Sequence, residues 1–328
     1  MFPIRFTRKR HIIKIIFVVA LFLILLNEIT RRTSSPSYLY GSQRNKAYNQ
    51  TCDIPVTNNQ TSLAHRFPHI IIIGFGKTGT RALYQMIRLH PDVIGPSDEV
   101  RFFSNDQKYK QGIYRYLRLM PPTTVTQRTI EKSPDYIIKP GTAERLKKAL
   151  YHCHRSDDIK FIVVLREPFK RAVSEYLEWK LYVHHHMGKT LDDFEKLAIK
   201  ETGEVNNFHS QVNTSIYSYH IKKWLKIFDI NKICFVDGDA LVKEPYSVVK
   251  KLEKCLELRD FITSKHFYYN KMKGYYCPVN EQRIANCLAS SKGRTHPNID
   301  KDVEMKLRKF YELYNKELYN ITGINFGW

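Results

Sequence analysis

The sequence predicts a single α/β domain in which a central parallel sheet is flanked by helices. Two apolar runs carry this prediction: residues 70–73 are four consecutive Ile, and residues 161–165 read Phe-Ile-Val-Val-Leu. Runs that do not alternate with polar residues are typical of strands buried on both faces of a parallel sheet. A helical apolar pattern follows each run, and alternation of strands with helices indicates the α/β class. We expect this domain to occupy residues 68–328.

An N-terminal membrane anchor is expected to precede the domain. Basic residues dominate residues 1–11, and residues 12–29 are mostly apolar. The apolar stretch is short for a membrane helix, although Lys14 can extend its ammonium group towards the interface. No small-residue cleavage site follows, which favours a signal anchor over a cleaved signal peptide, and the basic leading flank predicts a cytoplasmic tail at residues 1–11. Residues 30–67 are rich in Ser, Asn, Gln and Thr and are expected to form a flexible luminal stem.

The charge balance predicts an anionic partner. The chain has 53 Lys and Arg against 32 Asp and Glu, a formal net charge of +21. Such an excess favours nucleic acid, an acidic membrane or a sulfated polysaccharide, and a luminal location argues against nucleic acid. Sequons for N-glycosylation agree with that location. They begin at Asn49, Asn59, Asn213 and Asn320.

The first predicted strand leads into a glycine-rich loop that suits an anion. Gly74, Gly76 and Gly79 are expected to allow positive φ angles and the close approach of a ligand. A helix is expected from Thr80 to His90, so its N-terminal amides and positive dipole end point into the loop. Lys77 adds a charge, and the Thr residues at 78 and 80 add hydroxyl donors. The loop and its flanks therefore form a P-loop-like phosphate-binding strand-loop-helix.

The spacing of the loop excludes one class of nucleotide site and leaves another open. A Walker motif needs a Gly at position 71, where this chain has Ile, so a kinase or ATPase site is not supported. The pattern G-x-G-x-x-G matches, but it is weak alone and does not call for Lys77 or the threonines. A tight turn without a ligand remains the alternative.

A second strand-helix unit places a cation at the ligand-binding edge of the sheet. Arg166 ends the strand at residues 160–165, and the carboxyl ends of parallel strands are where open α/β sheets bind ligands. Pro168 suits the first turn of the following helix, and Ser174 lies off its apolar face. The alternatives are a surface ion pair for Arg166 and a solvated helix position for Ser174. A third buried strand is expected at residues 233–236.

A carboxylate between these units is a candidate general base. Glu99 and Arg101 are two residues apart, so an extended segment would place both side chains on one side. A carboxylate held beside a cation stays ionised and can accept a proton from a hydroxyl group. The alternative is a solvated Glu on a loop.

The cysteines and histidines indicate a disulfide rather than a metal site. Cys277 and Cys287 close a small loop suited to a disulfide, whereas Cys234, inside an apolar strand, and Cys255, in a helix, are expected to be buried thiols. The histidine-containing runs at 152–154 and 184–186 do not have the spacing of a zinc site, so no metal is expected.

Several segments together resemble the luminal sulfotransferases of heparan sulfate. They are residues 77–83, residues 165–168 with Ser174, and residues 291–297. Residues 267–277 resemble the glucosamine 3-O-sulfotransferase branch of that family, and the similarity extends from Ile70 to Trp328. The resemblance implies a Golgi enzyme, a single-pass type II membrane protein with a luminal domain. It would transfer sulfate from 3′-phosphoadenosine 5′-phosphosulfate (PAPS) to the 3-hydroxyl of glucosamine in heparan sulfate, without a metal.

The resemblance also implies roles for residues on the donor side. Arg166 and Ser174 would hold the 3′-phosphate, and Tyr276 would make a weaker contact. Lys77, Thr78, Gly79, Thr80 and Arg81 would hold the 5′-phosphosulfate, with Lys77 stabilising the charge that grows on the leaving phosphate. Lys292, Gly293, Arg294 and Thr295 would close over the donor, and Arg294 would also meet the sugar chain.

On the acceptor side, the resemblance implies that Glu99 takes the proton from the 3-hydroxyl and that Lys132 and Arg101 lie beside the acceptor. It also implies a disulfide between Cys277 and Cys287. Three positions depart from the family pattern, which generally has His, Asp and Gly where this chain has Arg101, Ser104 and Thr78. Arg101 cannot carry a proton near neutral pH, so it can only orient Glu99 or bind sulfate. These departures do not affect the donor chemistry, but they leave open sulfation at nitrogen or at another position of a glycosaminoglycan. A non-catalytic, membrane-anchored polysaccharide-binding protein is the alternative from a different functional class.

Overall fold

The computed structural model describes residues 52–56, 62–280, 282, 285–288 and 297–328. All of these ranges belong to one compact unit, which spans Tyr48–Trp328. Within them, no helix combines the length and apolarity needed to cross a membrane. The predicted anchor at residues 12–29 lies outside the described residues.

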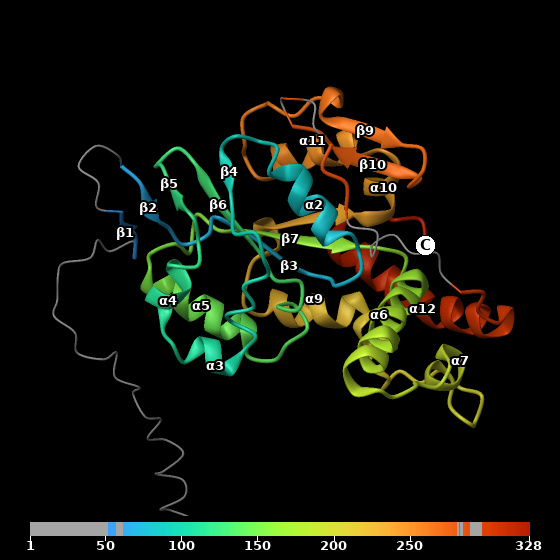
Figure 1. The fold of residues 1–328 in the computed structure, drawn as a ribbon. Coiled ribbons are helices and arrows are strands. Elements are labelled where there is room, and N and C mark those ends of the chain that lie inside the picture. The colour runs from blue at the N-terminus through green and yellow to red at the C-terminus, as the bar shows by residue number, and fades with distance from the viewer. Residues whose placement is uncertain (1–51, 57–61, 281, 283–284, 289–296) are drawn as a thin grey trace, which may run out of the picture. The chain divides into compact units, whose positions relative to one another are not determined.

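The central sheet is parallel, as the unbroken apolar runs predicted, and its strand order is β4-β6-β3-β7-β8 (Figure 1). In the centre of the sheet, Ile72 of β3 pairs with Lys132 of β6 on one side and with Ile162 of β7 on the other. This register brings the carboxyl ends of the three strands to one edge. The strands are β3 (Ile70–Gly74), β4 (Val93–Ile94), β6 (Arg128–Lys132), β7 (Lys160–Leu165) and β8 (Ile233–Asp237).

Helices cover both faces of the sheet because successive β3 side chains point to opposite sides. Ile70 and Ile72 pack in one apolar cluster with residues of α2 (Thr80–Ile87), α10 (Gly238–Lys243) and α11 (Pro245–Cys255). Ile71 and Ile73 pack in another with residues of α5 (Thr142–His152) and α9 (Tyr217–Leu225). Buried apolar side chains on both faces explain why β3 shows no polar alternation.

A further apolar cluster joins α6 to the helices around it and includes Phe169, Tyr176 and Tyr311. Pro168 occupies the first turn of α6, as predicted. The helices of this cluster are α6 (Pro168–Met187), α7 (Phe194–Ala198), α8 (Ser210–Thr214) and α12 (Lys301–Thr322). The remaining elements are β1 (Ile54–Pro55), β2 (Ala64–His65), α3 (Asp106–Tyr109), α4 (Ile113–Leu117), β5 (Pro122–Thr123), η1 (Ile230–Lys232), η2 (Ser264–His266), β9 (Phe267–Asn270) and β10 (Tyr275–Pro278).

Part of the segment expected to be a flexible stem belongs to the fold. Strands β1 and β2 pair with each other, and β2 pairs with β5. Phe67 is fully buried, and Asp53 forms ion pairs with Arg66 and Arg155. The stem predicted over residues 30–67 is therefore shorter at its C-terminal end, because a polar composition does not reveal these few anchoring contacts.

The expectation that Cys234 and Cys255 are buried thiols is wrong. They form a disulfide, because α11 packs against β8 and brings the two Cα atoms to 6.1 Å. Cys52 is joined to Cys153 at the end of α5, and the structure contains the predicted disulfide between Cys277 and Cys287. All six cysteines of the chain are therefore paired.

The three disulfides should differ in their contribution to stability. Cys52–Cys153 spans 101 residues, Cys234–Cys255 spans 21 and Cys277–Cys287 spans 10. Chain entropy predicts that paired Ala substitutions lower the free energy of unfolding by about 5 kcal/mol for the first bond and about 3 kcal/mol for each of the others. Urea unfolding of the three double variants measures this order. A smaller loss for the longest loop than for either short one would contradict it.

Candidate active site

A glycine loop at residues 75–79 connects β3 to α2 and lies at the carboxyl edge of the sheet (Figure 1). Gly79 is the N-cap of α2, with φ at 98° and no capping side chain. The first amides of α2 are therefore not occupied by a cap, and an anion could accept from them. Apart from its two chain neighbours, no described residue has a heavy atom within 4 Å of the place where a Cβ at Gly76 would be, so the described part of the chain leaves that side of the loop open.

The glycines serve different purposes from those that the sequence suggested. Only Gly79 of the three has a positive φ, and Lys77 itself adopts a φ of 71°. Gly74 is needed for packing instead, since a Cβ there would lie 2.3 Å from a side-chain carbon of Ile137. The expected positive φ at Gly74 and Gly76 is thus wrong, because the left-handed turns occur at Lys77 and Gly79.

The polar side chains of the loop already have partners. The Nζ of Lys77 lies 3.1 Å from the carboxylate of Glu178 on α6. The hydroxyl of Thr78 donates to the carbonyl of Phe75 (2.7 Å), so it closes the loop upon itself. Thr80 is buried in the first turn of α2, and Arg81 beside it is exposed.

Arg166 lies where the sequence predicted, directly after β7. Its Nε–H donates to Asp239 at the start of α10 (3.3 Å), and its carbonyl accepts from the Tyr217 hydroxyl (2.7 Å). Arg166 therefore forms an ion pair, and its partner is Asp239. Arg171 pairs with Glu175. Ser174 lies half-buried two helical turns into α6.

Glu99 is held between two cations. One carboxylate oxygen forms an ion pair with Lys132, the last residue of β6. The other accepts from the Nε (2.9 Å) and the terminal amino group (2.5 Å) of Arg101. The predicted pairing of Glu99 with Arg101 is therefore present, although Arg101 has a φ of 49° and the segment is not extended.

The two cations control the ionisation of Glu99. Burial raises the pKa of this carboxyl group, but the hydrogen bonds and charges of Lys132 and Arg101 outweigh burial, and the pKa falls below its ordinary value. Burial lowers the pKa of Lys132, which Glu99 opposes and the charge of Arg81 reinforces. The influence of Arg81 indicates that the start of α2 and the Glu99 pair share one electrostatic environment.

A buried polar network supports the backbone around Glu99. The hydroxyl of Ser133 accepts the backbone N–H of Arg101 (2.8 Å) and donates to the fully buried carboxylate of Glu131 (2.5 Å). Tyr116 donates to the other oxygen of Glu131 (2.5 Å), and the Tyr136 hydroxyl accepts from the N–H of Phe102 (2.9 Å). Burial raises the pKa of Glu131, against the opposing hydrogen bonds of Ser133 and the tyrosines.

The sequence did not single out Asp239 or Asp135 as site residues. Asp239 lies three residues after the third predicted strand, at residues 233–236. Asp135 accepts from the hydroxyl of Ser104 (2.8 Å), so a carboxylate lies beside position 104. Both residues shortly follow the end of a parallel strand. This position in the sequence could have identified them as candidate site residues.

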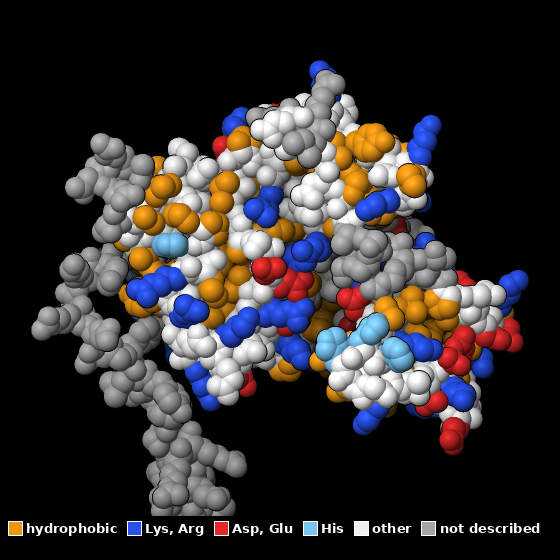
Figure 2. All heavy atoms as spheres, in the orientation of Figure 1, with side chains coloured by type: hydrophobic (Ala, Val, Ile, Leu, Met, Phe, Trp, Pro, Cys, Tyr) orange, Lys and Arg blue, Asp and Glu red, His pale blue; other side chains and the backbone are white. Residues whose placement is uncertain are grey.

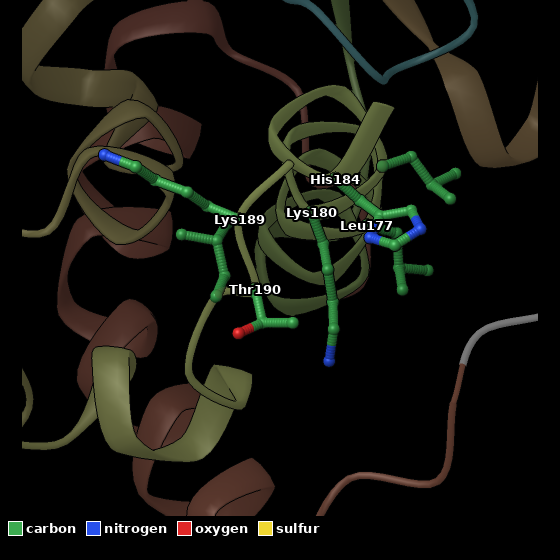
Figure 3. A pocket seen from close by; sticks show the side chains of 7 residues that line it. Leu177, Lys180, His184, Lys189 and Thr190 are labelled. Atoms are coloured by element: carbon green, nitrogen blue, oxygen red, sulfur yellow. The ribbon is translucent and has the colours of Figure 1, made fainter. Parts of the chain in front are cut away.

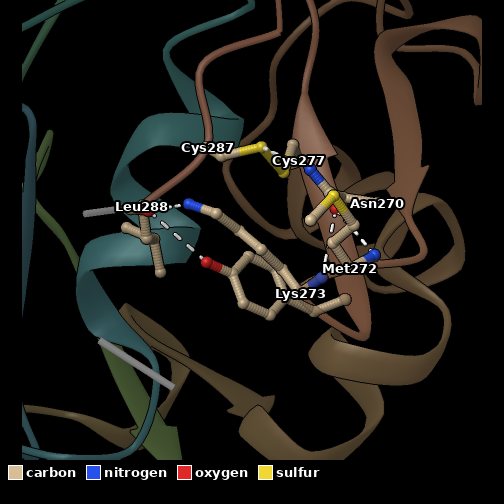
Figure 4. The surroundings of a disulfide bond; sticks show 7 residues. Asn270, Met272, Lys273, Cys277, Cys287 and Leu288 are labelled. Carbon is tan, nitrogen blue, oxygen red and sulfur yellow. Dashed lines mark hydrogen bonds between the residues drawn. A yellow bond between two sulfur atoms is a disulfide. The ribbon is translucent and has the colours of Figure 1, made fainter. Parts of the chain in front are cut away.

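Tyr276 and the Cys277–Cys287 disulfide lie on and beside the β9–β10 hairpin. The Tyr276 ring contacts the Tyr269 ring edge to face, with centroids 5.1 Å apart. Figure 4 shows that Lys273 and Tyr275 both donate to the carbonyl of Leu288, close to the disulfide (2.7 and 3.4 Å). The chain is therefore held just before residues 289–296. The predicted donor-closing residues Lys292, Gly293, Arg294 and Thr295 lie outside the described residues.

The predicted glycosylation residues are distributed over both described and undescribed parts of the chain. Asn49 and Asn59 lie outside the described residues. Asn213 is half-buried in α8 and donates to the Asn207 carbonyl (3.1 Å), and Asn320 is exposed in the last turn of α12.

The described residues contain no group of three or more His, Cys, Asp or Glu side chains arranged to hold a metal ion.

A separate cavity of about 280 Å³ lies against the C-terminal half of α6 (Figure 3). Leu177, Lys180 and His184 of the helix line it together with Lys189 and Thr190, which follow the helix in the chain. Glu99, Lys77 and Arg166 do not line it, so it is distinct from the site at the carboxyl ends of the strands.

On the face drawn in Figure 2, Lys and Arg side chains gather around a small acidic group in front of the central sheet.

This arrangement suits the transfer of an anionic group to a hydroxyl. The open glycine loop, Lys77 and Arg166 can bind a phosphorylated donor, and the ionised Glu99 can accept a proton from an acceptor. The elements that carry them end at one edge of the sheet, so donor and acceptor can be aligned.

Comparison with known proteins assigns the chain to a family. Residues 67–322 match the family model described as the sulfotransferase domain. Heparan sulfate glucosamine 3-O-sulfotransferase 5 of Mus musculus is 42% identical over 267 residues, which cover 81% of this chain and 75% of that protein. Heparan sulfate glucosamine 3-O-sulfotransferase 3B1 of Homo sapiens is 38% identical over 269 residues, covering 80% and 65%.

The solved structure of a sulfotransferase from Alicyclobacillus acidocaldarius has the same fold. Its TM-score is 0.56 at 21% identity, and the match covers 78% of this chain and 96% of that one. The family model and the curated relatives together show that the chain belongs to the sulfotransferase domain family and, within it, to the heparan sulfate glucosamine 3-O-sulfotransferases.

Proposed function

We propose that the protein transfers the sulfuryl group of PAPS to the 3-hydroxyl of glucosamine residues in heparan sulfate, with Glu99 as the general base. The observation that carries this proposal is the Glu99 carboxylate, kept ionised by Lys132 and Arg101 at the sheet edge that also bears the glycine loop. The curated relatives carry the name of this reaction.

The donor would bind along the loop and the end of β7. Amides of the glycine loop and α2, with Lys77, would meet the 5′-phosphosulfate, while Arg166 and Ser174 would meet the 3′-phosphate. The uncapped start of α2 and the open side of Gly76 fit an anion of this kind. Lys77 would leave Glu178 in favour of the donor and stabilise the charge that develops on the departing phosphate.

The acceptor would lie on the Glu99 side. Glu99 removes the proton from the 3-hydroxyl, the resulting oxygen forms a bond to sulfur, and the bond between sulfur and the 5′-phosphate oxygen breaks. The products are the sulfated sugar and adenosine 3′,5′-bisphosphate. As in phosphoryl transfer, alignment and electrostatic stabilisation do most of the work. Lys132 and Arg101 orient Glu99, and their remaining donors suit the sulfates and carboxylates of the polysaccharide.

A luminal domain of a Golgi type II membrane protein is part of the proposal. Pairing of all six cysteines is typical of an oxidising compartment, and the apolar residues 12–29 behind a basic flank support an anchor. Protease protection in sealed Golgi vesicles tests this placement. Digestion of the domain without detergent would contradict it.

Incubation with labelled PAPS and defined heparan oligosaccharides, followed by mapping of the sulfated hydroxyl, tests the reaction directly. Label on the 3-hydroxyl of glucosamine is expected. Label on nitrogen or on another hydroxyl would identify a different acceptor position. Isothermal titration with adenosine 3′,5′-bisphosphate that gives no heat would instead indicate a polysaccharide-binding protein without a donor site.

Substitution of the proposed base should stop chemistry without preventing donor binding. Glu99→Gln keeps the shape of the side chain but cannot accept the proton, so kcat should fall by about 10²–10⁴-fold. The affinity for adenosine 3′,5′-bisphosphate, measured by titration, should be unchanged. Asp98→Asn, which alters the exposed carboxylate next in the chain, is the matched control and should keep its activity. A near-normal rate for Glu99→Gln would refute the assignment.

The pH dependence should report the cations around Glu99. Because the pKa of Glu99 lies below its ordinary 4.5, the acid limb of kcat/KM that belongs to this group should lie below pH 4.5. Lys132→Met removes a cation that favours the ionised form, so the pKa should rise and the limb should move to higher pH. Lys139→Met, which alters an exposed lysine after β6, should leave the limb in place. An identical limb in the Lys132 variant would contradict this prediction.

A further inference from the structure

One carboxylate holds both the side chain of Arg166 and the backbone beside it. Asp239 accepts the Nε–H of Arg166 on Oδ1 (3.3 Å) and the backbone N–H of Glu167 on Oδ2 (2.9 Å). From the other side, the buried Tyr217 hydroxyl holds the Arg166 carbonyl (2.7 Å). Since Nε belongs to the planar guanidinium group, its bond to Asp239 restricts the direction in which that plane faces.

The start of α10, which carries Asp239, lies against both the glycine loop and the end of β7. A Cβ at Gly238 would lie 2.1 Å from the carbonyl oxygen of Thr78 in the glycine loop and 2.9 Å from that of Leu165 at the end of β7. Only glycine permits this approach. Asp237 then fixes the backbone of Asp239 by accepting its N–H (2.8 Å). The position of the Asp239 carboxylate is thus set by contacts with the loop and the strand that it serves.

We propose that Asp239 is a positioning residue that orients the Arg166 guanidinium towards the 3′-phosphate and so determines the preference for a nucleotide that carries this group. The inference rests on the proposed function, in which Arg166 meets the 3′-phosphate. Asp239 uses the Nε–H, and no residue in the described ranges accepts a hydrogen bond from the terminal amino groups of Arg166. Those amino groups suit a bidentate contact with phosphate.

Nucleotide binding separates this role from a merely structural one. Asp239→Ala should weaken the binding of adenosine 3′,5′-bisphosphate by about tenfold, as expected for a charge-assisted contact that is no longer aligned. The binding of adenosine 5′-phosphate, which lacks only the 3′-phosphate, should be unchanged. Asp239→Asn keeps a hydrogen-bond acceptor, so its affinity for adenosine 3′,5′-bisphosphate should fall by less. Glu244→Ala, at an exposed carboxylate beyond the other end of α10, should bind both nucleotides normally.

A double variant tests whether Asp239 acts through Arg166. In an Arg166→Ala background, Asp239→Ala should not weaken bisphosphate binding further. The inference would be overturned if Asp239→Ala weakened the binding of both nucleotides equally, or weakened the binding of neither. If Asp239→Ala does not fold, Asp239→Asn decides by the same comparison. Normal bisphosphate binding by Arg166→Ala alone would instead overturn the donor arrangement on which the inference rests.

Discussion

The parallel pairing of β6, β3 and β7 is the constraint on which the site depends. Ile72 lies opposite Lys132 on one side and Ile162 on the other, so the three strands end at one edge. That edge receives the glycine loop from β3, Lys132 from β6 and Arg166 after β7. A shift of register would separate these groups, whereas the apolar side chains on both faces hold the register in place.

Glu99 has no strand of its own, and its position depends on polar contacts instead. Lys132 is almost fully buried, so loss of the Glu99 carboxylate would leave a buried charge without its partner. Behind this ion pair, the hydroxyl groups of Ser133 and Tyr136 accept backbone N–H groups of residues 101–103, and Ser133 in turn donates to Glu131. Strand β6 thus supplies the cation that pairs with Glu99, and the residue directly after it supplies the hydroxyl that binds the Arg101 backbone.

Much of the fold could be predicted because its signals are local. Unbroken apolar runs identified β3, β7 and β8, and Pro168 marked the start of α6. Contacts between distant segments could not be predicted. The Cys234–Cys255 disulfide depends on α11 packing against β8, and the glycine at position 74 is explained only by Ile137. In the site, Arg166 was located by its place after a strand, but its partner Asp239 comes from 73 residues further along the chain.

The ion pair between Lys77 and Glu178 has a consequence for selectivity among anions. A bare ammonium group beside free amides would attract any small anion of the surrounding fluid, such as inorganic sulfate or phosphate. Here such an ion has to compete with a carboxylate that is already 3.1 Å from the Lys77 nitrogen. In the proposed arrangement, a nucleotide with several anionic groups would gain contacts at the loop and at Arg166 together, whereas a simple ion would gain only one of them. The ion pair of Lys77 with Glu178 therefore disfavours the binding of inorganic sulfate or phosphate more than the binding of the proposed donor.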